Sequence, residues 1–210
     1  MPEKDAQASI KIVLLPPVTK FLVMRNLWYI IVLALCFVGC KSQPEHKLTI
    51  DYKAVGDSLI NKTFDTLSHA LIQAMAASGP EGAIGLCNEK AIEITGIYGT
   101  ADFKINRTAL RVRNTANKPT ADELEILQAY QHQMEKGDSL KPLLVKAENG
   151  EHHYYKPILL KPMCLSCHGL PDKEIAANTL NAISAKYPLD MATGFTAGSL
   201  RGMWHVQFSK

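Results

Sequence analysis

The chain has 210 residues, with 23 basic and 20 acidic side chains and a formal net charge of +3. Residues 1–39 carry four of the basic and two of the acidic residues, so the remaining 171 residues hold 19 basic against 18 acidic side chains. Such a nearly neutral segment, without a basic cluster interleaved with aromatic residues, indicates no nucleic-acid partner. Its length suits one ordinary domain with a sizeable core.

The first 39 residues have the pattern of a signal peptide. Arg25 precedes residues 27–39, which contain no charge and form a run too short for a comfortable membrane span. Met24 is the expected biological start, because the positively charged region of a signal peptide begins there. The protein is therefore predicted to be exported to the periplasmic side of a bacterial membrane.

The end of the uncharged run resembles a bacterial lipoprotein signal, in which a cysteine is lipidated after cleavage. Cys40 is the predicted lipidation site, and it follows Gly39. Phe37 departs from the pattern, since leucine is usual three residues before the modified cysteine. Cleavage by ordinary signal peptidase and retention of the run as an anchor stay open. Residues 40–53 are then anchor and tether, and residues 54–210 form the domain.

Helical periodicity follows the tether. Apolar residues recur at steps of three and four from residue 48 to residue 78, where Ser78-Gly79-Pro80 supplies a stop. A second helix is expected from about residue 81 or 82 to residue 97. It contains Cys87 near its beginning, where the helix dipole lowers the pKa of a thiol.

Beyond Gly99 the pattern changes to extended structure at residues 103–112, followed by a polar loop. Thr120 and Glu123 stand at the positions of a capping box, which predicts a helix that ends at Gly137. Extended segments that alternate with helices in this way favour a mixed domain over an all-helical one.

The last third of the chain completes this pattern. Residues 143–147 and 152–160 flank Asn149-Gly150, which predicts a hairpin with a type I′ turn. A helix is expected at residues 173–185 and a closing strand at residues 203–208. The order predicts an α+β fold in which a small antiparallel sheet is flanked by helices.

One short motif carries the chemistry. Cys164, Cys167 and His168 form the Cys-x-x-Cys-His signature of covalent c-type haem attachment. One helical turn presents both thiols to the two vinyl groups, and the adjacent imidazole becomes the proximal iron ligand. We expect the other ring nitrogen of His168 to be held by a backbone carbonyl or another acceptor.

Three other readings of the two cysteines are weaker. A zinc site lacks a second Cys-x-x-Cys or His-x-x-x-His. A thioredoxin-like redox pair needs a strand before it and a long helix after it, whereas Pro162 precedes the motif and Gly169 and Pro171 follow. A structural disulfide leaves His168 unexplained.

The second axial ligand is open from the residues alone. Cys36 leaves with the signal peptide, so Cys87 is the one thiol left without a role, and an inert core cysteine is the alternative. The rival ligands are Met163, Met191, Met203, His69 and His205.

The loop at residues 107–117 carries arginines that are candidates for the haem carboxylates. Arg107 and Arg113 are the predicted contacts, because arginine recognises carboxylates through paired donors. A solvated loop explains Arg111 equally well. His152 and His153 are adjacent on a predicted strand, so their side chains point to opposite faces and at most one of them faces the haem.

Several blocks of residues, in the same order along the chain, resemble one known family, the c-type haem proteins with a PAS-like fold. This family was formerly catalogued as a domain of unknown function and occurs in cyanobacterial haem proteins and in sensor regions of bacterial signalling proteins. Ala109, Leu110 and Thr115 depart from its usual Ser and Pro. The blocks that match are Cys87-Asn88 with Ala91, Arg107-Thr108, Arg113-Asn114, Ala116-Asn117 with Pro119, Tyr155-Lys156-Pro157, the haem motif through Gly169, Tyr187-Pro188 with Asp190, Gly194, and Gly198 through Arg201-Gly202.

The resemblance implies a PAS-like antiparallel sheet flanked by helices, one haem c, and an unusual distal cysteine ligand, which is Cys87 here. Two functional classes follow. The protein is expected to be a lipid-anchored electron carrier or redox module with a redox partner protein; the alternative is a haem-based redox or gas sensor that signals through a partner. A catalytic role comes third.

Overall fold

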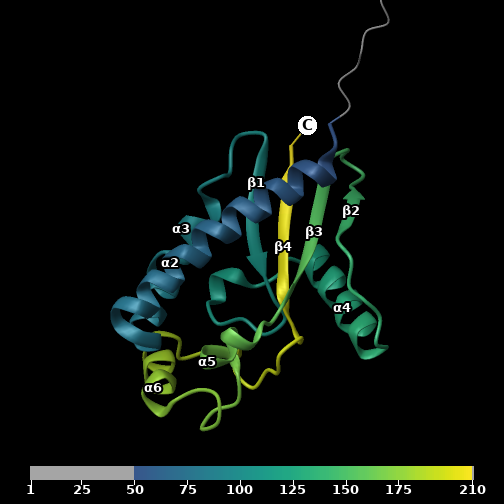
Figure 1. The fold of residues 1–210 in the computed structure, drawn as a ribbon. Coiled ribbons are helices and arrows are strands. Elements are labelled where there is room, and N and C mark those ends of the chain that lie inside the picture. Colours follow the sequence, from purple (N-terminus) through teal and green to yellow (C-terminus); the bar gives the residue numbers. More distant parts are fainter. Residues whose placement is uncertain (1–49, 210) are drawn as a thin grey trace, which may run out of the picture. The chain divides into compact units, whose positions relative to one another are not determined.

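The computed structural model describes residues 50–209; the predicted signal peptide, Cys40 and most of the tether lie outside this range. The described chain has the expected α+β fold, built around a four-stranded sheet with the order β1-β4-β3-β2 (Figure 1). All neighbouring strands are antiparallel. The strands are β1 (Phe103–Thr108), β2 (Leu143–Lys146), β3 (His152–Leu159) and β4 (Leu200–Phe208).

Helices cover both faces of the sheet. Helix α2 (Tyr52–Glu89) packs on one face, where its Ile60 joins Trp204 of β4 in one buried cluster. Helix α4 (Ala121–Glu135) packs on the other face, where Leu127 joins Met203. The two clusters alternate along β4 because successive strand residues point to opposite faces. Within residues 50–209, no helix combines the length and the apolarity that a membrane crossing needs.

Shorter elements connect these layers. The polar loop after β1 includes one 3-10 turn, and the haem motif, the following loop and the approach to β4 lie at the end of the sheet where β1 finishes (Figure 1). The elements are α3 (Ala91–Gly96), η1 (Thr115–Asn117), η2 (Pro162–Cys164), α5 (Leu165–His168) and α6 (Ala177–Lys186).

The break predicted near residue 79 is confirmed, and so is a helix beyond it, but that helix ends at Glu89 instead of residue 97. Gly79 has φ 64° and ψ −172°, which interrupts α2, and Pro80 then opens a second helical segment that ends at Glu89. Cys87 therefore lies in the last turn of that segment, and the prediction that it lies near a helix beginning is wrong. The negative end of the helix dipole does not favour a thiolate there.

Two other boundaries differ from the predictions. Helix α2 begins at Tyr52 rather than at residue 48, because Asp51 caps it by accepting from the amides of Lys53 and Ala54. Helix α6 begins at Ala177 rather than at residue 173. Residues 170–175 form a turn instead, in which the Ile175 amide donates to the Leu170 carbonyl at 3.2 Å.

The predicted hairpin is confirmed as β2 and β3, but its turn is not of type I′. That type needs positive φ at both central residues, whereas Gly150 has φ 85° and Asn149 does not have a positive φ. The Gly150 amide donates to the Ala147 carbonyl, and the Ala147 amide donates to Glu151, both at 2.9 Å. The connection is thus a three-residue loop with a left-handed glycine, which the Asn149 side chain supports by accepting from the Glu151 amide.

The capping box of α4 is confirmed and extends into the core. Glu123 is 3% exposed, and its side chain bonds the Thr120 amide at 2.9 Å. His205 on β4 donates to Glu123 at 2.7 Å, and its other ring nitrogen lies 2.9 Å from His153 of β3. Burial alone would raise the pKa of Glu123, but the bonds from His205, Thr120 and Asn106 lower it to about 2.

Glu123→Gln should therefore flatten the acid limb of the stability curve. Above about pH 4.5, folded and unfolded Glu123 are both ionised, and the stabilisation is complete. As the pH falls from about 4.5 to 2, only the unfolded state gains the proton, which costs up to about 1.4 kcal/mol of unfolding free energy per pH unit. Denaturant unfolding of both proteins at pH 7, 4 and 3 tests this, and parallel acid limbs would contradict it.

Candidate functional site

The Cys-x-x-Cys-His motif forms a compact helical turn, as its spacing predicts. Residues 162–164 make the 3-10 turn η2, and α5 continues directly from it to His168. Cys164 and Cys167 are free, half-buried thiols. Gly169 follows the turn, and a larger residue would not fit there, since an added Cβ would lie 2.6 Å from the Glu174 Cβ and 2.7 Å from the Leu165 carbonyl oxygen. Among residues 50–209, no three His, Cys, Asp or Glu residues are grouped to hold a metal ion.

His168 is fixed in the tautomer that a proximal ligand requires. Its Nδ1 lies 2.7 Å from the backbone carbonyl oxygen of Ala192, which can only accept, so Nδ1 carries the hydrogen and Nε2 keeps its lone pair. Burial first, and then the charges of Arg201 and Arg113, lower the pKa of His168 to about 3. The imidazole is therefore neutral at physiological pH, and Nε2 is available to a metal. The expected backbone acceptor is confirmed.

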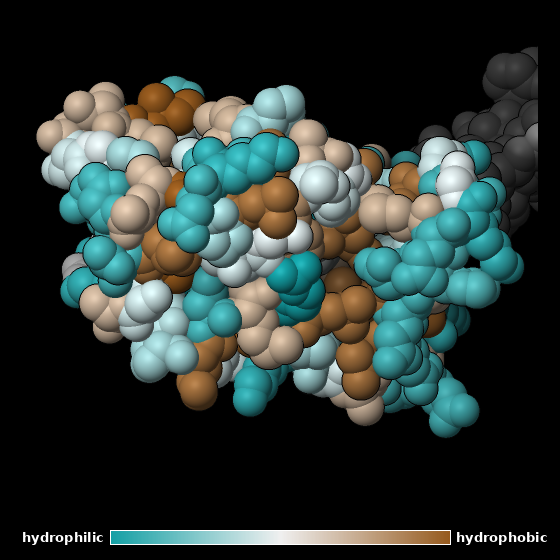
Figure 2. All heavy atoms as spheres, turned by 90° about the horizontal axis from the view of Figure 1, so that it is seen from below, coloured by the Kyte–Doolittle hydropathy of each residue, from teal (hydrophilic) through white to brown (hydrophobic). Residues whose placement is uncertain are grey.

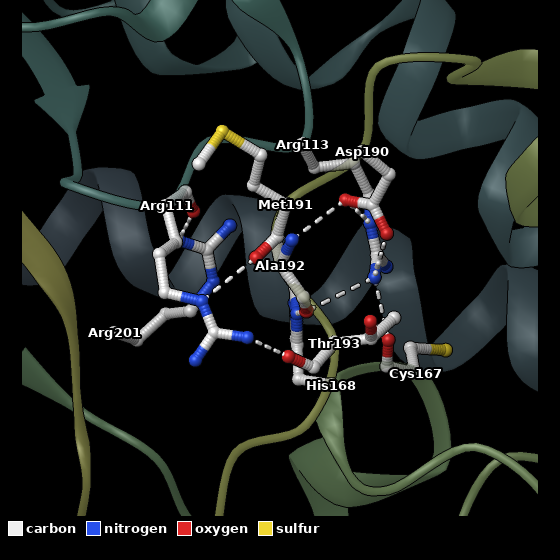
Figure 3. Close-up of polar contacts among 9 residues, drawn as sticks. All are labelled: Arg111, Arg113, Cys167, His168, Asp190, Met191, Ala192, Thr193 and Arg201. Atoms are coloured by element: carbon white, nitrogen blue, oxygen red, sulfur yellow. Dashed lines mark hydrogen bonds and ion pairs between the residues drawn. The ribbon is translucent and has the colours of Figure 1, made fainter.

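Arg113 holds the segment that carries this carbonyl (Figure 3). Its Nε and Nη2 bond the two carboxylate oxygens of Asp190 at 3.1 and 3.3 Å. Nη2 also donates to the carbonyls of Cys167, at 2.6 Å, and Ala192, at 3.2 Å. One guanidinium thus ties the haem motif to residues 190–192. Arg113 has an organising role that the sequence did not indicate, and its contact with a haem carboxylate stays a prediction.

Arg107 lies at the end of β1, with its side chain held between two elements. Its Nε donates to Thr95 of α3 at 3.1 Å, and its guanidinium carbon lies 5.4 Å from the Trp204 ring centre. Burial lowers the pKa of Arg107, and the Cys87 thiol acts in the opposite direction. Arg107 also lowers the pKa of His168, so the two groups are within electrostatic reach.

Cys87 belongs to the same electrostatic neighbourhood. Burial raises the pKa of its half-buried thiol, while Arg107 and Arg113 lower it and Cys167 raises it. The structure therefore brings Cys87 near both the haem motif and the two predicted arginines, although these residues are distant in sequence. The donor set fits an iron porphyrin: two thiols on one turn, a neutral imidazole, a further thiol, and cations for carboxylates.

Comparison with protein families gives a match over most of the chain. A model of the Tll0287-like family, described as Tll0287, matches residues 41–209. The chain belongs to the Tll0287-like family. A search of solved structures gives the crystal structure of the cyanobacterial heme-protein Tll0287, with 23% identity and a TM-score of 0.55, over 77% of this chain and 98% of that chain. At this identity the match shows the fold. No curated protein matches.

The rival axial ligands of this Tll0287-like chain have varied surroundings, and two of them are close to the motif in sequence or space: Met163 belongs to η2, and Met191 precedes Ala192. Met203 is fully buried in the cluster beneath α4, and His205 on the same face is engaged by Glu123 and His153. His69 is exposed on α2, and Met163 and Met191 are 64% and 55% exposed.

The two hairpin histidines also have other partners. His152 stacks on Tyr52 at 4.0 Å on the α2 face of the sheet, whereas His153 contacts His205 on the α4 face. Their opposite directions agree with the alternation predicted from the sequence, and neither ring is near the haem motif by these contacts.

Arg201 is a site residue that sequence reasoning missed in this Tll0287-like domain. It lies at the start of β4 and donates from Nη1 to the Arg111 carbonyl at 3.0 Å. Burial, followed by the charges of Arg113 and Arg107, lowers its pKa to about 10. Among the arginines, Arg201 is the strongest influence on His168. The sequence signal that could have identified Arg201 was its position in the block from Gly198 to Gly202, which is one of the blocks that resemble the family.

Proposed function

We propose that the protein is an exported, single-haem c-type cytochrome that works in electron transfer or as a redox module. The observation that supports this proposal most directly is the fixed, neutral His168 imidazole, which follows two free thiols on one helical turn. Cys164 and Cys167 would hold the group covalently, and His168 would be its proximal ligand. When bound, the haem iron supplies a one-electron couple between Fe(III) and Fe(II). The relative named a heme-protein supports this assignment.

Cys87 is the proposed distal ligand. Its burial opposes ionisation, so the thiolate depends on the positive charge of Arg107 and Arg113 and on the metal itself. Arg107 is the proposed partner of a haem carboxylate, since its guanidinium keeps donors beyond its one side-chain hydrogen bond to Thr95, and Arg113 stays the second predicted contact. A thiolate ligand would hold the reduction potential low compared with methionine.

The second candidate is a haem-based redox or gas sensor with a PAS-like sheet. The observation that favours it is the raised pKa of Cys87, because a thiol that resists ionisation is released readily when the iron is reduced. Release of one axial ligand would give the domain two states, which a signalling partner could recognise.

Carbon monoxide separates the two functions. Rapid binding to the reduced protein, with loss of the low-spin spectrum, supports a sensor, and an unreactive iron supports a carrier. The variant Cys87→Ala should change the oxidised spectrum from six-coordinate low-spin and admit carbon monoxide in either case. His69→Ala is the matched control on α2 and should leave the spectra unchanged. An unchanged Cys87→Ala spectrum would exclude Cys87 as the ligand.

Export and lipid anchoring at Cys40 complete the proposal. Wild-type protein is expected in the membrane fraction, with an N-terminus that begins at a lipidated Cys40, because an acylated cysteine with several chains holds a small domain on a membrane. The Cys40→Ser form should appear in the soluble periplasmic fraction. Mass spectrometry of the mature N-terminus tests this, and an intact Met24 start would contradict cleavage.

A further inference from the structure

A cavity of about 400 Å³ lies on the α4 side of the domain, apart from the thiols of the haem motif. It is formed by α4, the start of the loop after β1, the loop that leads into β4 and the first residues of β4. Its volume is within the range of small-molecule sites. The lining residues include Leu110, Leu127, Gln131, Met134, Phe195 and Arg201.

The walls combine an apolar surface with positive charge. Leu110 and Met134 are half-buried and supply apolar surface, Leu127 lies fully buried among the lining residues, and two arginines flank the Phe195 ring. The guanidinium carbon of Arg111 lies 4.1 Å from the centre of this ring, and that of Arg201 lies 5.8 Å from it. On the face seen from below in Figure 2, apolar side chains likewise reach the surface between hydrophilic ones.

The positive charge is not balanced by the protein around it. Within residues 50–209, no carboxylate lies within ion-pair distance of Arg111 or Arg201. Asp190 acts on Arg201 at longer range, but its two oxygens are engaged by Arg113. Arg111 donates hydrogen bonds from Nε and Nη2 to the carbonyls of residues 191 and 193. Arg201 has a single hydrogen bond to protein and retains further donors.

We propose that this cavity binds a small organic monocarboxylate with an apolar body, with the carboxylate on Arg201 and the body against Leu110, Met134 and Phe195. An anion is favoured because it compensates a partly desolvated guanidinium, and the apolar body is favoured because it displaces water from apolar walls. The same carboxylate chemistry is present on haem. The test below distinguishes a free ligand from a haem carboxylate that already occupies Arg201.

The cavity and the haem motif are connected through one backbone segment. Residues 190–199 contribute both the Ala192 carbonyl that holds His168 and the cavity residues Phe195 and Thr196. The Phe195 amide donates to the His168 carbonyl at 2.9 Å. Binding in the cavity should therefore shift the reduction potential of the haem iron. This shift rests on the proposed function, whereas the binding of the carboxylate does not depend on it.

The test is a calorimetric titration of the holoprotein with phenylacetate, and with phenylacetamide as the neutral isostere. Phenylacetate is expected to bind, and phenylacetamide to bind at least about tenfold more weakly, as for the loss of a charge-assisted bond. Arg201→Gln should lose that preference, Arg201→Lys should keep much of it, and Lys104→Gln on β1 is the matched control that removes a charge elsewhere.

Gln131→Trp keeps the test valid if Arg201→Gln fails to fold. It fills the cavity from the half-buried face of α4 and should abolish phenylacetate binding without removing a charge. Absence of binding to the wild-type holoprotein overturns the proposal, and is the result expected if a haem carboxylate occupies Arg201. Equal binding of the amide, or binding that survives Gln131→Trp, also overturns it.

Discussion

Replacing Cys167 with serine is expected to reduce the covalently bound haem about tenfold or more, because only one sulfur of the helical turn then remains to react. Cys164 and Cys167 are both free and half-buried, with no disulfide that would compete for them. Heme staining of a denaturing gel, together with the intact mass of the exported protein, measures the loss.

Cys87→Ser is the matched cysteine control. It removes a thiol of similar exposure that is not part of the attachment motif, and it should keep the covalent haem while changing its spectrum. The attachment model would be wrong if Cys167→Ser retained a full complement of covalent haem, or if Cys87→Ser lost as much as Cys167→Ser does.

The second large effect is expected from Arg113→Met, which should lower the free energy of unfolding by about 3–5 kcal/mol. The Arg113 and Asp190 side chains are each 8% exposed, so removal of the guanidinium leaves a buried carboxylate without its partner. The carbonyls of Cys167 and Ala192 lose the same donor, which loosens the backbone that orients His168.

Denaturant unfolding measures this loss, and Lys90→Met serves as the control. Lys90 pairs with Glu93 at 3.0 Å, but both side chains are more than half exposed, so its loss should cost at most about 1 kcal/mol. A cost for Arg113→Met no larger than that of Lys90→Met would show that Arg113 does not hold this segment together.

Local signals in the sequence predicted the fold well where neighbouring residues decide the structure. Thr120 and Glu123 form the capping box, and the Asn149-Gly150 pair joins two strands. The turn type was missed because the Asn149 side chain bonds the Glu151 amide instead of supporting a second positive φ. The position of Cys87 in its helix was missed because the helix predicted to reach residue 97 ends at Glu89, where Lys90 separates it from α3.

The candidate site was predictable only in its covalent part. Cys164, Cys167 and His168 are adjacent in sequence, so their spacing alone indicates the chemistry. The groups that orient His168 are not adjacent: Ala192 is 24 residues away, and Arg113 reaches Asp190 across 77 residues. Such contacts depend on tertiary packing, which residue types do not reveal. For the same reason Arg201 was not recognised as a neighbour of His168.

Acid-acetone extraction of the purified wild-type protein, followed by absorption spectra of pellet and supernatant, tests the central claim most directly. Thioether bonds survive this treatment, whereas a haem held by coordination alone does not. The account predicts that the pigment stays with the precipitated protein, in the amount of one haem per chain. Pigment in the supernatant, or protein that carries no haem before extraction, would contradict it.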